Sequence, residues 1–263
     1  MSVVTQARSG AAPRARRRSP LVQLSRVEFK LFLRERIGPI WGVGLPLLLL
    51  VIFGAIPAFK KVLPHSGGLT VMDSYLPILI ALSLALLALV VTPYSLAGYR
   101  ERGVLRRLRT TPAGPARVLG AVLIVNLSTV VVVLILLLVV GRLAYSVPFP
   151  LDLGAWVVTA VLTVAALMAM GLFIAAVGPT ARAAAAIGNI LFYPMMFFSG
   201  LWLPIPSMPA VLQHISHAMP LGAAWEAFQQ ADLGHWPPAL PLITMAIWAA
   251  AFGAAAVRFF RWE

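Results

Sequence analysis

The chain has 263 residues, of which 60% are hydrophobic and only 11% are charged. An ordinary soluble domain has about 25% charged residues, so a soluble fold is excluded and an integral membrane protein is indicated. The formal charge of +13 comes from 21 Lys and Arg against 8 Asp and Glu, and because the basic residues lie between long apolar runs, they favour membrane topology over nucleic-acid binding.

The N-terminal segments are basic. Residues 1–19 are rich in Ala, Arg, Ser and Pro without a hydrophobic period, which predicts a disordered basic tail. A Ser-Pro pair then has the pattern of an N-cap and a first-turn proline, and predicts a helix over residues 20–36. Arg26, Lys30 and Arg34 form a cationic stripe on this helix. We therefore expect an amphipathic helix at the cytosolic interface; the alternative is the start of a long first transmembrane helix.

The apolar runs predict an all-α membrane protein with six transmembrane helices, because one span needs about 20 apolar residues. The spans are expected at residues 37–59, 74–98, 118–141, 154–177, 184–203 and 237–257. Residues 204–236 contain several prolines and two short amphipathic patterns. They predict an outer re-entrant helical hairpin between spans 5 and 6, shielded from lipid by the protein. Residues 258–263 follow the last span as a tail.

The basic residues also set the orientation. Eighteen of the 21 Lys and Arg fall on one side of the six predicted spans, and only Lys60, Lys61 and Arg142 fall on the other. Basic residues accumulate on the cytosolic side of membrane proteins. Both termini are therefore expected in the cytosol, with the chain in the inner membrane of a bacterial cell.

The sequence does not indicate that this chain by itself couples energy to transport, hydrolyses ATP or binds a metal. The predicted spans contain no charged residue, and each lysine follows Phe or Lys rather than Gly, so a Walker A motif is absent. His214 and His217 share a helical face, but Glu226 is the nearest carboxylate and the chain has no Cys, so no metal site is expected. An intramembrane enzyme, with Ser199 as nucleophile, remains the alternative of a different class.

The loop after the second predicted span has a distinct pattern. Its apolar residues follow helical spacing between arginines, and Pro112 and Pro115 stop the helix. We interpret residues 100–109 as a helix that continues the second span and docks a cytosolic partner; lipid headgroup binding is the alternative. Glu101, the only acid there, is expected to orient the helix by pairing with Arg or Lys. The candidate coupling residues are Glu101, Gly103, Val104, Leu105, Arg106, Leu108 and Arg109.

Several features together carry a family resemblance: the predicted interfacial helix over residues 20–36, Pro209 and three short motifs. Arg-Glu-Arg-Gly-Val-Leu-Arg-Arg-Leu-Arg-Thr-Thr-Pro at 100–112 and Phe-Ser-Gly-Leu-Trp-Leu-Pro at 198–204, with Met-Pro-Leu at 219–221, resemble a permease subunit of the type-2 ABC exporter family. The resemblance implies a dimer with a second permease subunit, the same or homologous, above two cytosolic ATPase subunits. It implies alternating access driven by ATP, with ATP and Mg bound by the ATPase and no cofactor bound by this chain. Without a fused ATPase, the chain is similar to the half-size, separately encoded permeases.

The resemblance also implies functional surfaces. The first and fifth spans would line the dimer interface and the pathway, and the hairpin would form the outer gate, with Glu226 facing the aqueous exit. The substrate is inferred from composition instead: the uncharged, aromatic and Met-rich residues of the candidate pathway favour a lipophilic drug or antibiotic, with lipid-linked glycan or polysaccharide as the alternative. Trp225 and Phe228 are expected to pack against Trp202 or the lipid-side helices. The candidate pathway residues are Asn126, Asn189, Tyr193, Met196, Phe197 and Ser199, whose polar members have interhelical hydrogen bonding as the alternative role. The candidate gate residues are Trp202, Pro204, Trp225, Glu226 and Phe228.

Overall fold

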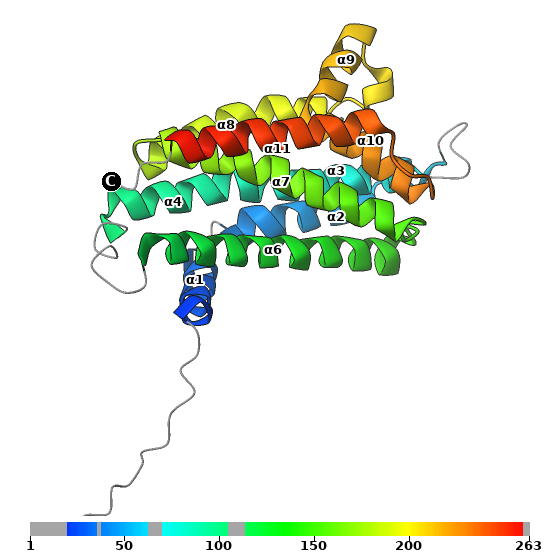
Figure 1. Ribbon diagram of the computed structural model, residues 1–263. Coiled ribbons are helices and arrows are strands. Elements are labelled where there is room, and N and C mark those ends of the chain that lie inside the picture. Colours follow the sequence, from blue (N-terminus) through cyan, green and yellow to red (C-terminus); the bar gives the residue numbers. More distant parts are fainter. Residues whose placement is uncertain (1–19, 36–37, 63–69, 105–113, 260–263) are drawn as a thin grey trace, which may run out of the picture.

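The computed structural model describes residues 20–35, 38–62, 70–104 and 114–259 (Figure 1). The predicted tail of residues 1–19, residues 260–263 of the predicted C-terminal tail, and Leu105, Arg106, Leu108 and Arg109 of the predicted coupling segment lie outside these residues, whereas Arg258 and Phe259 belong to the last helix. Within them the chain is helical, and the only β pairing is a single bridge between Val62 and Thr70.

The first half of the chain forms α1 and the first two spans. Its elements are α1 (Pro20–Glu35), the π-helical turn η1 (Gly38–Gly44), α2 (Leu45–Ala55), the short η2 (Pro57–Lys60), α3 (Val71–Ala85), the π-helical turn η3 (Leu86–Val91) and α4 (Thr92–Glu101). η1 and α2 together form the first apolar helix, and α3, η3 and α4 together form the second. A capping box starts the second helix, because the Thr70 side chain accepts from the Asp73 N–H while the Asp73 carboxylate accepts from the Thr70 N–H.

The second half contains the remaining spans and the hairpin. Its elements are α6 (Gly114–Tyr145), α7 (Leu153–Val177), α8 (Ala181–Phe198), the short η4 (Ile205–Ser207), α9 (Ala210–Ala218), α10 (Pro220–Asp232) and α11 (Ala239–Phe259). Asp152 caps α7, because its carboxylate accepts from the Ala155 N–H at 2.9 Å.

The structure confirms the prediction of an all-helical chain with six membrane-spanning helices. Six helical segments of the described residues are long and apolar enough to cross a membrane. They run Gly38–Ala55, Val71–Glu101, Gly120–Tyr145, Leu153–Val177, Ala181–Phe198 and Ala239–Phe259. The fifth ends at Phe198 rather than at residue 203, because Gly200 adopts a φ of 91° and turns the chain there.

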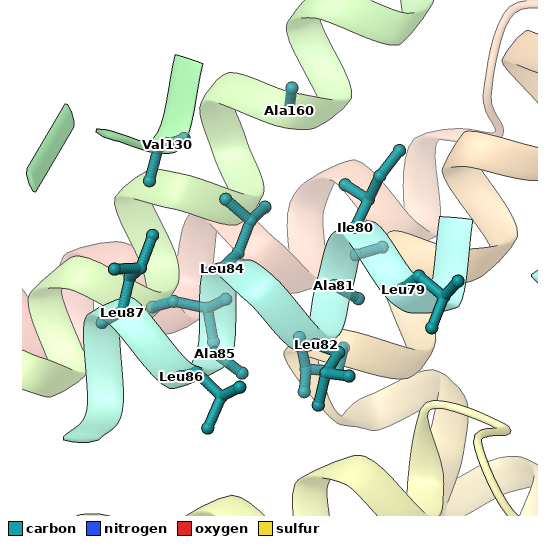
Figure 2. Close-up of a cluster of buried hydrophobic side chains, with 14 of the residues drawn as sticks. Leu79, Ile80, Ala81, Leu82, Leu84, Ala85, Leu86, Leu87, Val130 and Ala160 are labelled. Carbon is teal, nitrogen blue, oxygen red and sulfur yellow. The ribbon is translucent and has the colours of Figure 1, made fainter. Parts of the chain in front are cut away.

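The second span is the centre of the bundle. Of its most apolar stretch 89% is buried, against 17% for α11. Figure 2 shows side chains of α3 and η3 pointing to several sides, with Val130 of α6 and Ala160 of α7 nearby. A helix that is apolar all round is either packed inside a protein or exposed to lipid, and the second span is the packed case.

Two glycines let neighbouring helices approach the π-helical turn η3 closely. A Cβ atom on Gly171 of α7 would overlap the Ala88 carbonyl oxygen, and one on Gly188 of α8 would overlap the Leu89 carbonyl oxygen. Close helix approach in membranes commonly depends on such small residues. The backbones of α7 and α8 therefore contact η3 directly.

α1 and α9 lie outside the main bundle. In Figure 1, α1 runs across α6 rather than along it, and α9 projects at the far end of the molecule beside α10. The expected placement of α1 at the membrane interface, and the re-entrant character of the hairpin, remain predictions.

Candidate functional site at the junction of α4, α7 and α8

The bundle has two different ends (Figure 1). One end, called here the basic end, contains the end of α4, the start of α8 and the end of α11, and exposes Arg102, Arg182 and Arg258. The opposite end, called here the hairpin end, contains α9 and α10. The candidate coupling residues that the structure describes lie at the basic end.

Arg100, in the last turn of α4, holds the C-terminus of α7. Its Nη1 donates to the Ala176 carbonyl oxygen at 3.1 Å, and its Nη2 donates to the Gly178 carbonyl oxygen. The last carbonyls of a helix lack partners within the helix and carry partial negative charge, so a guanidinium is well suited to satisfy them. Two bonds to carbonyls of one helix end fix α4 against α7.

Glu101, the next residue, holds the N-terminus of α8. Its Oε2 accepts a hydrogen bond from the Ala181 N–H at 2.9 Å, while Thr180 caps the same helix by accepting from the Ala183 N–H at 3.1 Å. A carboxylate at a helix N-terminus is stabilised by the helix dipole. The expected pairing of Glu101 with Arg or Lys is therefore replaced, among the described residues, by a bond to backbone.

Adjacent residues of α4 thus hold both sides of the short turn between α7 and α8. We call Arg100, Glu101 and this turn (residues 178–180) the α4 clamp. A cavity of about 600 Å³ lies beside it. Its lining residues are Tyr94, Gly98, Glu101, Arg102, Thr180, Ala181 and Arg182.

The helix of the second span ends inside the predicted coupling segment. α4 ends at Glu101, and Gly103 adopts a φ of 66°, a left-handed conformation that ends an α-helix. Arg102 turns back, donating from Nε to the Gly98 carbonyl oxygen at 3.1 Å. Val104 is half-buried against Leu96 and its neighbours. The α-helix of the second span therefore ends before Gly103, which corrects the expectation of one continuous helix over residues 100–109.

The six candidate pathway residues do not share one surface. Asn126 is buried and donates to the Thr92 Oγ1 at 2.8 Å, and Thr92 in turn donates to the Leu87 carbonyl oxygen of η3. Asn126 thus forms a hydrogen bond between two helices, which was the alternative to lining the pathway. Ser199 is buried and donates to the carbonyl oxygen of Met196, which is also buried. Asn189 and Phe197 are half-buried, and Tyr193 is 60% exposed on α8.

The gate residues divide between the core and the surface. Phe228 is fully buried with its ring 5.2 Å from that of Trp156 in α7. Trp225 is buried against Ile78 of α3. Trp202, at 57%, and Pro204 are exposed. Phe228 and Trp225 therefore pack on spans 2 and 4, and the expected partner Trp202 lies at the surface, because the chain turns at Gly200 before reaching it.

Glu226 lies in a polar contact between the two hairpin helices. His217 Nδ1 of α9 donates to Glu226 Oε2 of α10 at 2.7 Å. Trp248 of α11 donates to the Ala218 carbonyl oxygen at 2.9 Å and ties the corner of the hairpin to the last span. Among the described residues, no group of three His, Cys, Asp or Glu side chains is placed to hold a metal ion.

Sequence reasoning missed several residues of the α4 clamp. Thr180 had a readable signal, because a threonine at the start of an apolar helical run is a typical N-cap. Arg100 had only the weaker signal of a basic residue in the last turn of a helix. Gly171 and Gly188, which lie outside the clamp and contact η3, had no local signal in the sequence, because their role depends on which helix lies opposite.

The fold and this junction define a multi-pass, all-helical membrane protein. The family model described as ABC-2 type transporter matches residues 20–233, and the chain therefore belongs to this family. It is 27% identical over 145 residues to the probable multidrug ABC transporter permease YbhR of Escherichia coli strain K12, and equally to that of Escherichia coli O157:H7. The match covers 55% of this chain and 39% of the length of those relatives.

Proposed function

We propose that the chain is the permease subunit of an ATP-driven exporter, with its basic end in the cytosol and the hairpin end outside. A cytosolic ATPase would dock on residues 100–109. Membership of the ABC-2 type transporter family and the placement of the α4 clamp beside this segment support the proposal. The eighteen-to-three distribution of basic residues supports the orientation.

The α4 clamp is the observation that carries the mechanism. Arg100 and Glu101, the first two residues of the docking segment, bond to the end of α7 and to the start of α8. A displacement of that segment by the ATPase would pull on both helices at once. Conformational coupling needs an element that both sites bias, and the clamped turn of α7 and α8 is such an element. It would carry ATP-driven movement into α8.

The substrate pathway would lie along α8, facing a second permease subunit. Ile190 and Tyr193 of α8 and Ile40 and Trp41 of η1 are exposed apolar or aromatic side chains of the fifth and first spans. Such surfaces accommodate lipophilic ligands of varied shape. The name of the Escherichia coli relatives, a probable multidrug permease, agrees with a lipophilic drug or antibiotic as substrate. The hairpin would gate the outer exit.

The decisive test is association with an ATPase subunit that carries a Gly-x-x-x-x-Gly-Lys-Ser/Thr motif. Leu105→Ala and Leu108→Ala should each reduce capture of the ATPase and reduce transport. Arg106→Ala and Arg107→Ala are matched controls that should chiefly change the dependence on salt, since rim charges mostly affect encounter. Capture is compared at two salt concentrations in equal amounts of inserted permease. Full capture by both leucine variants, with loss only in the arginine variants, would reject the apolar docking surface.

Orientation has a separate test, because the chain contains no cysteine. A single cysteine at Arg102 should be protected from a membrane-impermeant thiol reagent in intact cells. A cysteine at Val211 in α9, which is 70% exposed, should react. Labelling in the opposite pattern would invert the proposed topology.

A further inference from the structure

A groove lies between α1 and α6. It encloses about 700 Å³ and is separate from the α4 clamp and from the hairpin. Among its lining residues are Arg26, Val27, Phe29 and Lys30 of α1 and Ile124 and Ser128 of α6. The groove thus has two cations on one side and an apolar wall on the other.

We propose that this groove binds one anionic phospholipid. The phosphate of the headgroup lies between Arg26 and Lys30, and an acyl chain runs from the groove along the exposed face of α6. The site does not depend on transport activity, and its occupant is a component of the surrounding membrane rather than a substrate.

The cations are placed to bind one phosphate. Arg26 and Lys30 are four residues apart and therefore neighbours on one face of α1. Both are exposed, and among the side chains that the structure describes neither has a carboxylate partner. A guanidinium and an ammonium close together suit a phosphodiester, with arginine supplying paired donors and lysine a point charge.

The depth of the groove matches the headgroup boundary. α6 is about 48 Å long, so when it is centred on a hydrocarbon layer of roughly 30 Å its first 9 Å or so lie outside, and Ile124, about 15 Å from the start of the helix at Gly114, lies about 6 Å inside. A phosphate beside α1 at this level would sit near the interface, where basic residues favour anionic lipids.

An acyl chain has a continuous apolar path beyond the groove. Ile124, Leu127, Val131 and Ile135 follow one another on one face of α6 and are between 43% and 55% exposed. At a rise of 1.5 Å per residue this strip is about 17 Å long, close to half of the roughly 30 Å hydrocarbon thickness. That is the length available to an acyl chain of one leaflet. Free phosphate would gain nothing from this wall, which is why we assign a lipid.

The test uses the purified full chain in a mild zwitterionic detergent, with bound lipid counted by native mass spectrometry. Phosphatidylglycerol and phosphatidylcholine with identical acyl chains are added in equal amounts. The wild-type chain should retain one phosphatidylglycerol in preference to phosphatidylcholine. The preference should fall about fivefold for Arg26→Gln or Lys30→Gln and about 25-fold for the pair, given the usual contribution of one basic residue near an anionic surface.

Two controls separate a built groove from general attraction. Arg34→Gln removes a cation from the same helix at a position that does not line the groove, and it should leave the preference unchanged. Ile124→Trp fills the groove without changing charge and should displace the retained lipid. Val161→Trp, on the exposed face of α7, is its matched control. Inorganic phosphate should not compete.

Three results would overturn the proposal. They are equal retention of both lipids by the wild-type chain, an equal loss in Arg34→Gln and in the Arg26 and Lys30 variants, and unchanged retention in Ile124→Trp. Competition by inorganic phosphate at millimolar concentration would assign the cations to a free anion instead.

Discussion

The two ends of the bundle are held together by different kinds of contact. At the basic end, the charged side chains of Arg100 and Glu101 bond to backbone atoms at the termini of α7 and α8. At the hairpin end, the aromatic side chains of Trp225 and Phe228 are buried against the spans, and the indole N–H of Trp225 has no hydrogen-bond partner among the described residues.

The two kinds of contact have different effects: one mainly fixes the positions of the helices, and the other mainly stabilises the fold. A hydrogen bond to a named backbone atom fixes direction and position but contributes only about 0.5–1.5 kcal/mol, or somewhat more when charged. Burial of an aromatic side chain contributes more but is not directional. The bonds at the basic end therefore fix the positions of α4, α7 and α8 relative to one another, and the buried aromatic face at the hairpin end keeps α10 attached to the spans.

The largest expected effect is at the hairpin end. Phe228→Ala removes a fully buried ring that contacts Trp156, and deletion of a core Phe typically costs about 3–5 kcal/mol. The thermal midpoint of the detergent-solubilised protein should fall by several degrees. Val211→Ala, at a position that is 70% exposed on the same hairpin, should leave it unchanged. Equal midpoints for the two variants would mean that α10 is not held by its buried aromatic face.

A substitution at the basic end should lower the stability of the fold less than Phe228→Ala does. Arg100→Ala leaves the carbonyl oxygens of Ala176 and Gly178 without their charged donor, which should cost about 1.5–3 kcal/mol. Arg102→Ala is the matched control, because the bond of Arg102 to Gly98 stays within its own helix. If the two variants unfold at the same temperature, the bonds of Arg100 to α7 do not stabilise the junction.

A carboxyl group adds a pH dependence at the hairpin end. Burial, and then the negative charge of Asp73, raise the pKa of Asp232 at the end of α10 to about 7. The folded chain therefore binds a proton more tightly than the unfolded chain, whose carboxyl has an ordinary pKa near 3.8. Stability due to this group is full at low pH and is lost as the pH rises toward 7.

The expected loss between pH 5 and pH 8 is on the order of 1–2 kcal/mol, reduced from the full linkage value because part of Asp232 is exposed. Melting curves at several pH values should show it. Asp232→Asn should flatten the profile and stabilise the chain at pH 8, and Asp73→Asn should shift the profile to lower pH. A wild-type midpoint that rises from pH 5 to pH 8, with no change in Asp232→Asn, would contradict the assigned cause.

The six spans could be predicted from the sequence more completely than the α4 clamp. Runs of about 20 apolar residues predict the six helices, because each run by itself satisfies the requirement of the bilayer. The end of the fifth helix was placed too late, because Leu201 to Leu203 continue the apolar run although Gly200 has already turned the chain. Local composition indicates which residues are apolar enough to be buried. It does not reveal that one residue, Gly200, adopts a positive φ.

The α4 clamp depends on contacts between residues about 80 positions apart, such as Glu101 with Ala181. Glu101 has many arginines near it in sequence, and these suggested an ion pair. The N-terminus of α8 offers a free N–H and a positive dipole end instead, and only the fold brings it there. The candidate pathway residues do not lie on one surface for the same reason: their neighbours are set by the fold. Asn126, for example, bonds to Thr92 of another helix.

The smallest expected effect is at Glu101, and it decides whether the two sides of the clamp act together. Glu101→Ala should cost about 0.5–1 kcal/mol, as for the loss of a helix N-terminal cap, whereas Glu101→Gln keeps an acceptor oxygen and should cost less. Because Glu101 is exposed, the part of either loss that comes from its charge should shrink at high salt. The double variant with Arg100→Ala is the informative one. If the turn of residues 178–180 is held as a unit, losing one side already loosens the other, and the double variant should be less destabilised than the two single variants added together. Strict additivity would mean that α7 and α8 are held independently, and the clamp would then not pass a movement of α4 to both helices at once.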